Sequence, residues 1–321
     1  MIEGLVTVVI PVYNAGTFLR AAVESIIKQT YQNLEIYIVD DGSTDGCMDS
    51  ISMLVDPRIT IWRQENAGKA VAVNRALDAA KGEFWMVQDA DDISYPERVQ
   101  RQVNAMRADL ELAAVFVCID LIVRDTIFAP QYFGKSKAEC QSDVDHLLMP
   151  AHDATGMYRF SLLPNTRIDP ELRIGEGFDL IMRVGEMHPI LLIDGCWYSH
   201  RLNPDSLTHR DPVWNIEQVN LAIRKACDRR GAKYENFKQA LPKTHRWFKH
   251  RDMDTIVMYA VISVRQQKRL GRMGGALNTA LYCAKMHPFD YLYYKPLLLF
   301  ATPSLISEAY SSFKRSALCR R

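Results

Sequence analysis

The sequence predicts an α/β fold, in which a mostly parallel sheet is flanked by helices and followed by a helical C-terminal region. Two observations predict this fold class. In the first half of the 321-residue chain, short β-branched runs alternate with helix-spaced apolar segments, which is the pattern of βαβ units. From residue 213 onward the apolar spacing is helical. We therefore expect a first domain over residues 1–212 and a helical region over residues 213–321.

The elements of the first half follow from local patterns. The first strand is expected at 5–10, where LVTVVI is β-branched, and apolar residues then recur at helical spacing. An Ala-rich helix is closed by Gly82 as a stop, and a later helix carries Pro96 in its first turn. The expected order is strand 5–10, helix 18–27, strand 34–39, short helix 45–54, strand 59–63, helix 69–80, strand 84–88 and helix 96–107.

The second half is less regular at first. Between residues 140 and 209 the clearest element is a buried-looking strand at 190–193. Helices are then expected at 216–229, 254–269 and 274–285.

Composition excludes several classes of protein. The formal net charge of +1 gives no reason to expect nucleic-acid binding. The seven cysteines are scattered without a CxxC pair, which indicates reduced thiols. The N-terminus lacks the pattern of a signal peptide, and no apolar run reaches the roughly 18 residues of a spanning helix. We expect a cytoplasmic protein, either soluble or peripheral on the inner face of the cell membrane.

Polar clusters follow three of the expected strands. Ligands bind beyond the carboxyl ends of the strands in such sheets. The clusters are Pro11-Val12-Tyr13-Asn14, Asp40-Asp41-Gly42-Ser43 and Asp89-Ala90-Asp91-Asp92.

The last of these clusters ends the apolar run FWMVQ with three carboxylates. Like charges at this spacing repel one another, so they need water or a cation nearby. Asp89 and Asp91 have the i, i+2 spacing that places two side chains on one side of an extended segment. Mg²⁺ and Mn²⁺ prefer such oxygen ligands, so the alternatives are a solvated turn and a metal site that holds an anionic substrate.

Two longer stretches carry a resemblance to a known family. They are VTVVIPVYNAGTFLRAAVESIIKQTYQNLEIYIVDDGSTD and ENAGKAVAVNRALDAAKGEFWMVQDADD. Together they resemble the nucleotide-sugar-binding half of a family 2 glycosyltransferase of the bacterial polysaccharide-biosynthesis type. The resemblance covers roughly the first 100 residues, with a weaker echo to about residue 209. It implies a GT-A fold, which is Rossmann-like.

The resemblance implies roles for the acidic cluster and for the base-binding loops. Asp91 matches the aspartate that coordinates Mn²⁺ or Mg²⁺, and Asp89 is expected to face the ribose or to support the metal. Pro11, Tyr13 and Asn14 match the loop beside the base, and Asp41 matches the acid that binds uracil. Asp92 is expected to act as the N-terminal charge of the following helix, with support of the metal site as the alternative.

A second group of expectations concerns the diphosphate. Lys69 begins a helix, and a lysine with helix-start N–H groups suits phosphate; the alternative is a solvated surface lysine. His200 is a candidate metal ligand, or else a packed structural residue, and Arg201 a candidate phosphate clamp. Asn74 is expected to tie loops together.

The catalytic base is the least settled expectation. Transfer with inversion needs a carboxylate to take the proton of the acceptor hydroxyl. The family places this base in a Glu-Asp pair, but Gly177 stands where the Asp would be. Glu176 is our first candidate, and Asp179, one turn on, is the second.

The expected function is metal-dependent, inverting transfer of a hexosyl or N-acetylhexosaminyl group from a UDP-sugar to a glycan or lipid-linked saccharide. The alternative is a non-catalytic nucleotide-sugar-binding or assembly partner in polysaccharide synthesis. The C-terminal helices, with their Leu, Phe and basic residues, suggest packing, a homodimer or peripheral membrane contact.

Overall fold

The computed structural model describes residues 1–123, 126–128, 133–202, 212–234, 251–269, 271–286 and 291–301. Its strands are β1 (Ile2–Val12), β2 (Leu34–Asp40), β3 (Ile59–Arg63), β4 (Gly82–Val87), β5 (Ile93–Ser94), β6 (Ala114–Val123), β7 (Thr126–Phe128), β8 (Met157–Arg159) and β9 (Ile190–Arg201). Its α-helices are α1 (Leu19–Ile27), α2 (Lys69–Ala79), α3 (Arg98–Ala108), α4 (Lys137–Asp145), α5 (Glu176–Met187), α7 (Pro212–Arg229), α9 (Arg251–Arg269), α10 (Met273–Met286) and α11 (Lys295–Ala301). Short 3₁₀ helices are η1 (Gly16–Phe18), η2 (Cys47–Ile51), η3 (Asp153–Thr155) and η6 (Tyr291–Tyr294).

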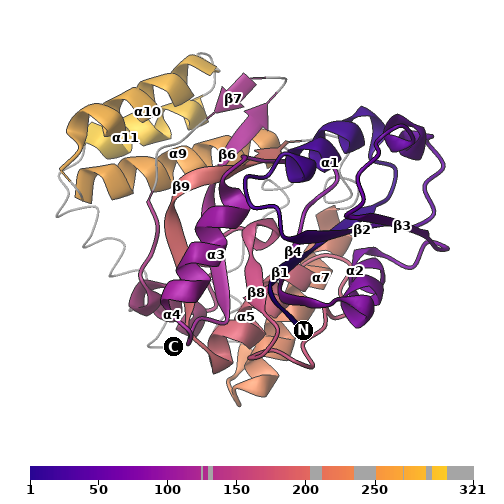
Figure 1. The fold of residues 1–321 in the computed structure, drawn as a ribbon. Coiled ribbons are helices and arrows are strands. Elements are labelled where there is room, and N and C mark those ends of the chain that lie inside the picture. The colour runs from indigo at the N-terminus through magenta and orange to yellow at the C-terminus, as the bar shows by residue number, and fades with distance from the viewer. Residues whose placement is uncertain are drawn as a thin grey trace. The chain divides into compact units, whose positions relative to one another are not determined.

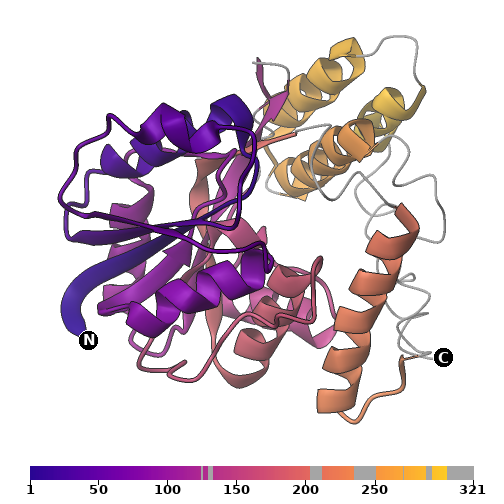
Figure 2. The same cartoon turned by 90° about the vertical axis from the view of Figure 1, so that its right-hand side faces the viewer.

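The chain divides into two compact units. The first comprises Met1–Asp120 and Gly134–Arg201, and the second comprises Leu121–Phe133 and Leu202–Arg321. Figures 1 and 2 show the strands and helices of the first unit in indigo to rose and the last helices of the second in orange to yellow.

The sheet of the described residues has the strand order β3-β2-β1-β4-β8-β6-β9-β5, with β7 paired to β6. Strands β3, β2, β1 and β4 are parallel, as βαβ connections require. Val12 pairs with Asp40 and Asp40 with Arg63, so these strands end level with one another. The chain leaves β1 for β2 on one side and reaches β4 on the other, so the carboxyl edge beside β1 is a switch point. The α/β fold is thus confirmed.

The irregular segment adds strands of the opposite direction. Strand β8 pairs antiparallel with β4 and with β6, and β5 pairs antiparallel with the end of β9. These pairings bring the chain after residue 150 against the end of β4.

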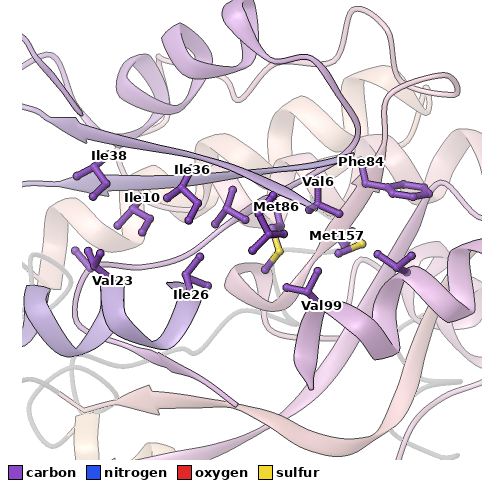
Figure 3. Packing of buried hydrophobic residues seen from close by; sticks show 14 of the residues in the cluster. Val6, Ile10, Val23, Ile26, Ile36, Ile38, Phe84, Met86, Val99 and Met157 are labelled. Carbon is purple, nitrogen blue, oxygen red and sulfur yellow. The ribbon is translucent and has the colours of Figure 1, made fainter. Parts of the chain in front are cut away.

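The core of the first unit lies between the sheet and helices α1 and α3. Side chains of alternate strand residues, such as Ile10, Ile36 and Met86, meet Val23 of α1 and Val99 of α3 (Figure 3). Helix α2 instead contacts β1 and β2. Helices therefore pack against the strands whose carboxyl ends form this edge of the sheet.

Several local expectations differ from the structure. The segment after β2 forms the 3₁₀ helix η2 and not an α-helix, and α3 begins at Arg98, two residues after Pro96. Gly82 does not cap α2, because α2 ends with Ala80 in an extended conformation and Gly82 already begins β4. Gly82 instead pairs with Ile2 of β1, next to a shift in the β1–β4 register.

In its described residues the second unit is mostly helical, apart from a short hairpin of β7 and the end of β6. Helices α9, α10 and α11 pack around Val264, Ala276 and Ala280, with Leu297 and Phe300 beside them. Among the described residues, no helix is both long enough and apolar enough to span a bilayer.

Candidate functional site

The three carboxylates of the acidic loop after β4 differ in their bonding partners. Asp89 Oδ1 accepts from Lys69 Nζ at 2.8 Å, and this charge outweighs burial and lowers the pKa of Asp89. Asp92 is fully buried and accepts from His200 Nδ1 at 3.1 Å and from the backbone N–H of Arg201 at 2.7 Å. Burial, with the charges of Asp92 and Asp89, raises the pKa of Asp91 to about 7. Asp91 is therefore the carboxylate of this loop whose charge is least compensated.

Asp92 corrects an expectation. The side chain that was expected to serve the next helix instead joins the acidic loop to the end of β9. Helix α3 starts six residues later, at Arg98, which is too far for the carboxylate to cap it. Asp92 thus holds the end of β9 against the acidic loop, and its alternative role in supporting a metal site stays a prediction.

A buried polar network holds the acidic loop. The side-chain amide of Gln88 donates to the carbonyl oxygens of Asp89 and Asp92, each at 3.0 Å. Its Oε1 accepts from Ser94 Oγ at 2.6 Å and from the buried guanidinium of Arg98. Because these groups are buried and bonded, they fix the backbone that carries the acids.

The end of β9 brings His200 and Arg201 to the same loop. His200 holds Asp92 through Nδ1, and its ring lies against that of His152 with centroids 4.6 Å apart. Burial disfavours the imidazolium, but the charge of Asp92 outweighs it and raises the pKa of His200 to about 9. Arg201 Nε donates to the carbonyl of Asp91 at 3.0 Å, and the guanidinium lies over the ring of Phe18. Arg201 thus borders the loop where a phosphate clamp was expected.

Lys69 joins the acidic loop to the head of α5. Its Nζ lies 2.8 Å from Asp89 and 3.7 Å from Glu176 Oε1. Burial disfavours its charge, but Asp89, Glu176 and Asp153 outweigh that effect and raise the pKa of Lys69 well above its usual value. Lys69 is therefore paired with carboxylates of the site. It is not a solvated surface lysine, which was the alternative expectation.

The two candidate bases differ in their surroundings. Asp179 is buried, and its Oδ2 accepts from Arg183 Nε at 2.7 Å. Glu176 is the first residue of α5, and burial raises the pKa of its carboxyl to about 7, with Lys69 opposing and Asp153 adding to the rise. The structure favours Glu176 over Asp179, because the carboxylate of Asp179 is committed to an ion pair within its own helix.

The expected base-binding residues lie together at the ends of β1 and β2. Tyr13 is exposed, while Asn14 has a positive φ of 50° and accepts from the N–H of Thr44 at 2.8 Å. The carboxylate of Asp41 is buried and accepts from Gln64, Ala67 and Gly68 at 2.8–2.9 Å. Asp41 thus holds the loop that leads into α2. Its expected role toward uracil stays a prediction, as does that of Pro11, which is half-buried in β1.

Asn74 confirms its expected role. Its side chain donates to the carbonyl of Ile168 at 2.7 Å and accepts from the N–H of Ile168 at 2.9 Å. Helix α2 is thereby tied to the segment that leads into α5.

The residues around the acidic loop offer oxygen ligands for a divalent cation. In the described part of the chain, no three His, Cys, Asp or Glu side chains are grouped as a ready-made metal site. The donor set nevertheless suits Mg²⁺ or Mn²⁺, which bind through one or two carboxylates and complete their shell with phosphate oxygens and water. Asp91 offers such a carboxylate, and Asp92 fixes the orientation of the His200 ring at the end of β9. The residues therefore fit a cation held jointly with a diphosphate.

The fold and the position of this site define the class of protein. The described fold is that of the GT-A glycosyltransferases. TarS from S. aureus, solved in complex with UDP-GlcNAc, matches with a TM-score of 0.60 at 16% identity, over 89% of this chain and 93% of that chain. The mannosyltransferase PcManGT from Pyrobaculum calidifontis, solved with GDP-Man and Mn²⁺, matches with a TM-score of 0.53 at 19% identity, over 94% and 86%. At these identities the likeness establishes the fold.

The sequence comparisons give the family. Residues 7–165 match the family described as Glycosyl transferase family 2, and this part of the chain belongs to it. Glycosyltransferase GlyG of Streptococcus pneumoniae is 45% identical over 112 residues, which are 33% of this chain and 37% of GlyG. Glycosyltransferase GlyA of the same organism is 38% identical over 248 residues, which are 71% of this chain and 34% of GlyA. The chain therefore spans about a third of the length of these curated relatives.

Two neighbours of the site were not among the site residues chosen from the sequence. The guanidinium of Arg173 lies so close to Gly68 that a Cβ there would meet its nitrogen at 2.0 Å. Asp153 lies against Gly177 in the same way. Both residues lie outside the strands and α-helices, where no periodicity predicts which way a side chain points.

Proposed function

We propose that the chain is a metal-dependent, inverting glycosyltransferase that moves a hexosyl or N-acetylhexosaminyl group from a UDP-sugar to a glycan or lipid-linked saccharide. The observation that carries this proposal is the position of Lys69, whose ammonium contacts the acidic loop and the head of α5 together. A donor diphosphate beside the acidic loop and an acceptor hydroxyl beside the head of α5 would therefore meet near Lys69. The ligands named for TarS, UDP-GlcNAc, and for PcManGT, GDP-Man, support a nucleotide-sugar as the donor.

In this proposal, different side chains bind different parts of the donor. Pro11, Tyr13, Asn14 and Asp41 border the base and ribose, while Lys69 and Arg201 face the diphosphate. Asp91, with Asp89 and His200, would hold Mn²⁺ or Mg²⁺, which when bound neutralises charge on the diphosphate.

The transfer itself is a single displacement. The acceptor oxygen bonds to the anomeric carbon as the bond from that carbon to the diphosphate breaks, and the electron pair leaves with the diphosphate. The hydroxyl proton passes to a carboxylate near Lys69. Among the residues chosen from the sequence, Glu176 is better placed for this than Asp179, which is held by Arg183.

The other parts of the proposal concern partners. We retain a functional division into residues 1–212 and 213–321, with the helical region contacting a membrane surface or a second copy. The basic residues of the tail, Lys314, Arg315, Arg320 and Arg321, lie outside the described residues.

The test is a donor screen with the purified chain. UDP-glucose, UDP-galactose, their N-acetylated counterparts and GDP-mannose are offered with Mn²⁺ and octyl glycoside acceptors, and nucleotide release and product mass are measured. Release of UDP with a matching glycoside product supports the proposal. Tight UDP binding without turnover of any donor would favour the non-catalytic alternative, which the glycine at position 177 suggests.

A further inference from the structure

Position 177 lacks a side chain, but the space for one is filled from another part of the chain. Gly177 is buried in the first turn of α5. A Cβ built on it would lie 2.1 Å from Oδ2 of Asp153 and 2.4 Å from its Cγ. The carboxylate of Asp153 therefore occupies the volume in which a residue-177 side chain would begin.

Asp153 is held there by buried groups. It begins η3, where the Gly156 N–H donates to its carbonyl at 3.1 Å. Arg98 donates to the carbonyl of Ala154 and Gln102 to that of Thr155, each at 2.8 Å, and both side chains are fully buried. The network that fixes the acidic loop through Gln88 thus also fixes the turn that carries Asp153.

The charges around Asp153 place it in the candidate site. Its charge is among those that raise the pKa of Lys69 and that of Glu176. Its side chain is 28% exposed and so remains open to a ligand, and its Oδ1 lies 3.6 Å from His152 Nδ1. Asp179, in contrast, is 1% exposed.

We propose that Asp153 is the catalytic base, a proposal that rests on the function proposed above. Its carboxylate takes the place of the acidic side chain that position 177 lacks. The Asp153 carboxylate takes the proton of the acceptor hydroxyl as that oxygen bonds to the anomeric carbon and the diphosphate leaves with the bonding pair. Glu176 lies beside Lys69 and, in its ionised form, accepts a hydrogen bond from the acceptor. The pair of carboxylates is thus assembled from η3 and α5.

The first test is Asp153→Asn, which keeps the shape of the side chain and removes the base. With the best donor and acceptor from the screen, turnover should fall by about 10²-fold or more, the usual contribution of a general base. UDP affinity should stay within about twofold of the wild-type value. Glu111→Gln, an exposed acid on the same unit, is the matched control and should keep full turnover.

The second test moves the carboxylate from position 153 to position 177. Asp153→Ala empties the space, and Asp153→Ala/Gly177→Asp places a carboxylate there from α5. The double variant should regain at least about tenfold in turnover over Asp153→Ala. Gly177→Asp alone should lose turnover, because the two side chains would overlap.

The outcomes separate this proposal from the one on which it rests. Full turnover in Asp153→Asn, or a loss of UDP affinity that accounts for the whole effect, would overturn the role of Asp153 and leave the transferase intact. A double variant no faster than Asp153→Ala would also count against it. No turnover by the wild-type chain with any donor would overturn the proposed function, and the role of Asp153 with it.

Discussion

Lys69 illustrates how one residue gains its properties from the residues around it. From the sequence it is a lysine at the start of a helix, whereas in the structure three carboxylates surround it and raise its pKa. The cation in return lowers the pKa of Asp89 but does not fully offset the burial of Glu176. Neighbouring acids of one small site therefore differ in their charge at neutral pH.

Glu176 gives a prediction about pH. With a pKa of about 7, its carboxyl is ionised above pH 7 and gains a proton as the pH falls through that value. Only the ionised form accepts strong, charge-assisted hydrogen bonds, so turnover should halve near pH 7 and fall further toward pH 5.5. In Glu176→Gln the side chain is neutral at every pH, so its lower turnover should fall less between pH 8 and pH 6 than that of the wild type. A wild-type profile that is level down to pH 5.5 would contradict this.

Asp91 gives a prediction about metal. Burial and two acidic neighbours raise the pKa of its carboxyl, and a divalent cation would relieve the repulsion between the carboxylates. Asp91→Ala should therefore remove the Mn²⁺-dependent part of UDP affinity measured by titration calorimetry, while the metal-free affinity remains. Equal gains from Mn²⁺ in the variant and the wild type would show that the cation binds elsewhere.

At the scale of elements, helix α3 organises two loops far apart in sequence. Its buried Arg98 and Gln102 bond to the turn at 153–155, and Arg98 also bonds to Ser94 and Gln88 beneath the acidic loop. Burial lowers the pKa of Arg98 to about 10, so the guanidinium is still charged at neutral pH. One helix thus sets the distance between the proposed donor and acceptor sides.

This role of α3 can be tested by stability. Arg98→Met should leave several buried acceptors unpaired and cost about 3 kcal/mol or more. For a unit of this size, that loss lowers Tm by about 6–12 °C in a thermal melt. Arg101→Met, on the same helix with a side chain 52% exposed and paired to Glu97, is the control. It should cost under about 1 kcal/mol, and equal effects of the two changes would refute a special role for Arg98.

At the scale of the whole molecule, ligand binding should couple to stability. A ligand that binds only the folded chain stabilises it by about 2.7 kcal/mol at a hundredfold excess over Kd. UDP with Mn²⁺ should therefore raise Tm by about 5 °C or more, and UDP alone by less. Thermal melts of the full chain measure this, and ADP, which lacks the imide of uracil, is the control nucleotide. An equal shift with ADP would argue against a site selective for uracil.

The parallel half of the sheet was predictable because its signals are local. Alternating β-branched and helix-spaced runs, with polar residues at each strand end, require no knowledge of distant contacts. The same holds for Asp89, Asp91 and Lys69, which lie at the carboxyl edge because their strands and helix do. Two features were not predictable: Gly82 belongs to a strand and does not cap a helix, and Asp92 is buried. Partners far along the chain decided both.

By itself the sequence determined the class of this protein: the βαβ order, the acidic loop after β4 and the family to which residues 7–165 belong. Only the tertiary structure decided which carboxylates share Lys69, and that Asp153 fills the space beside Gly177. The physical reason is that a strand or helix follows from neighbours along the chain. A cluster of charges instead depends on where separate loops converge, and here buried bonds from Arg98 and Gln102 fix that convergence.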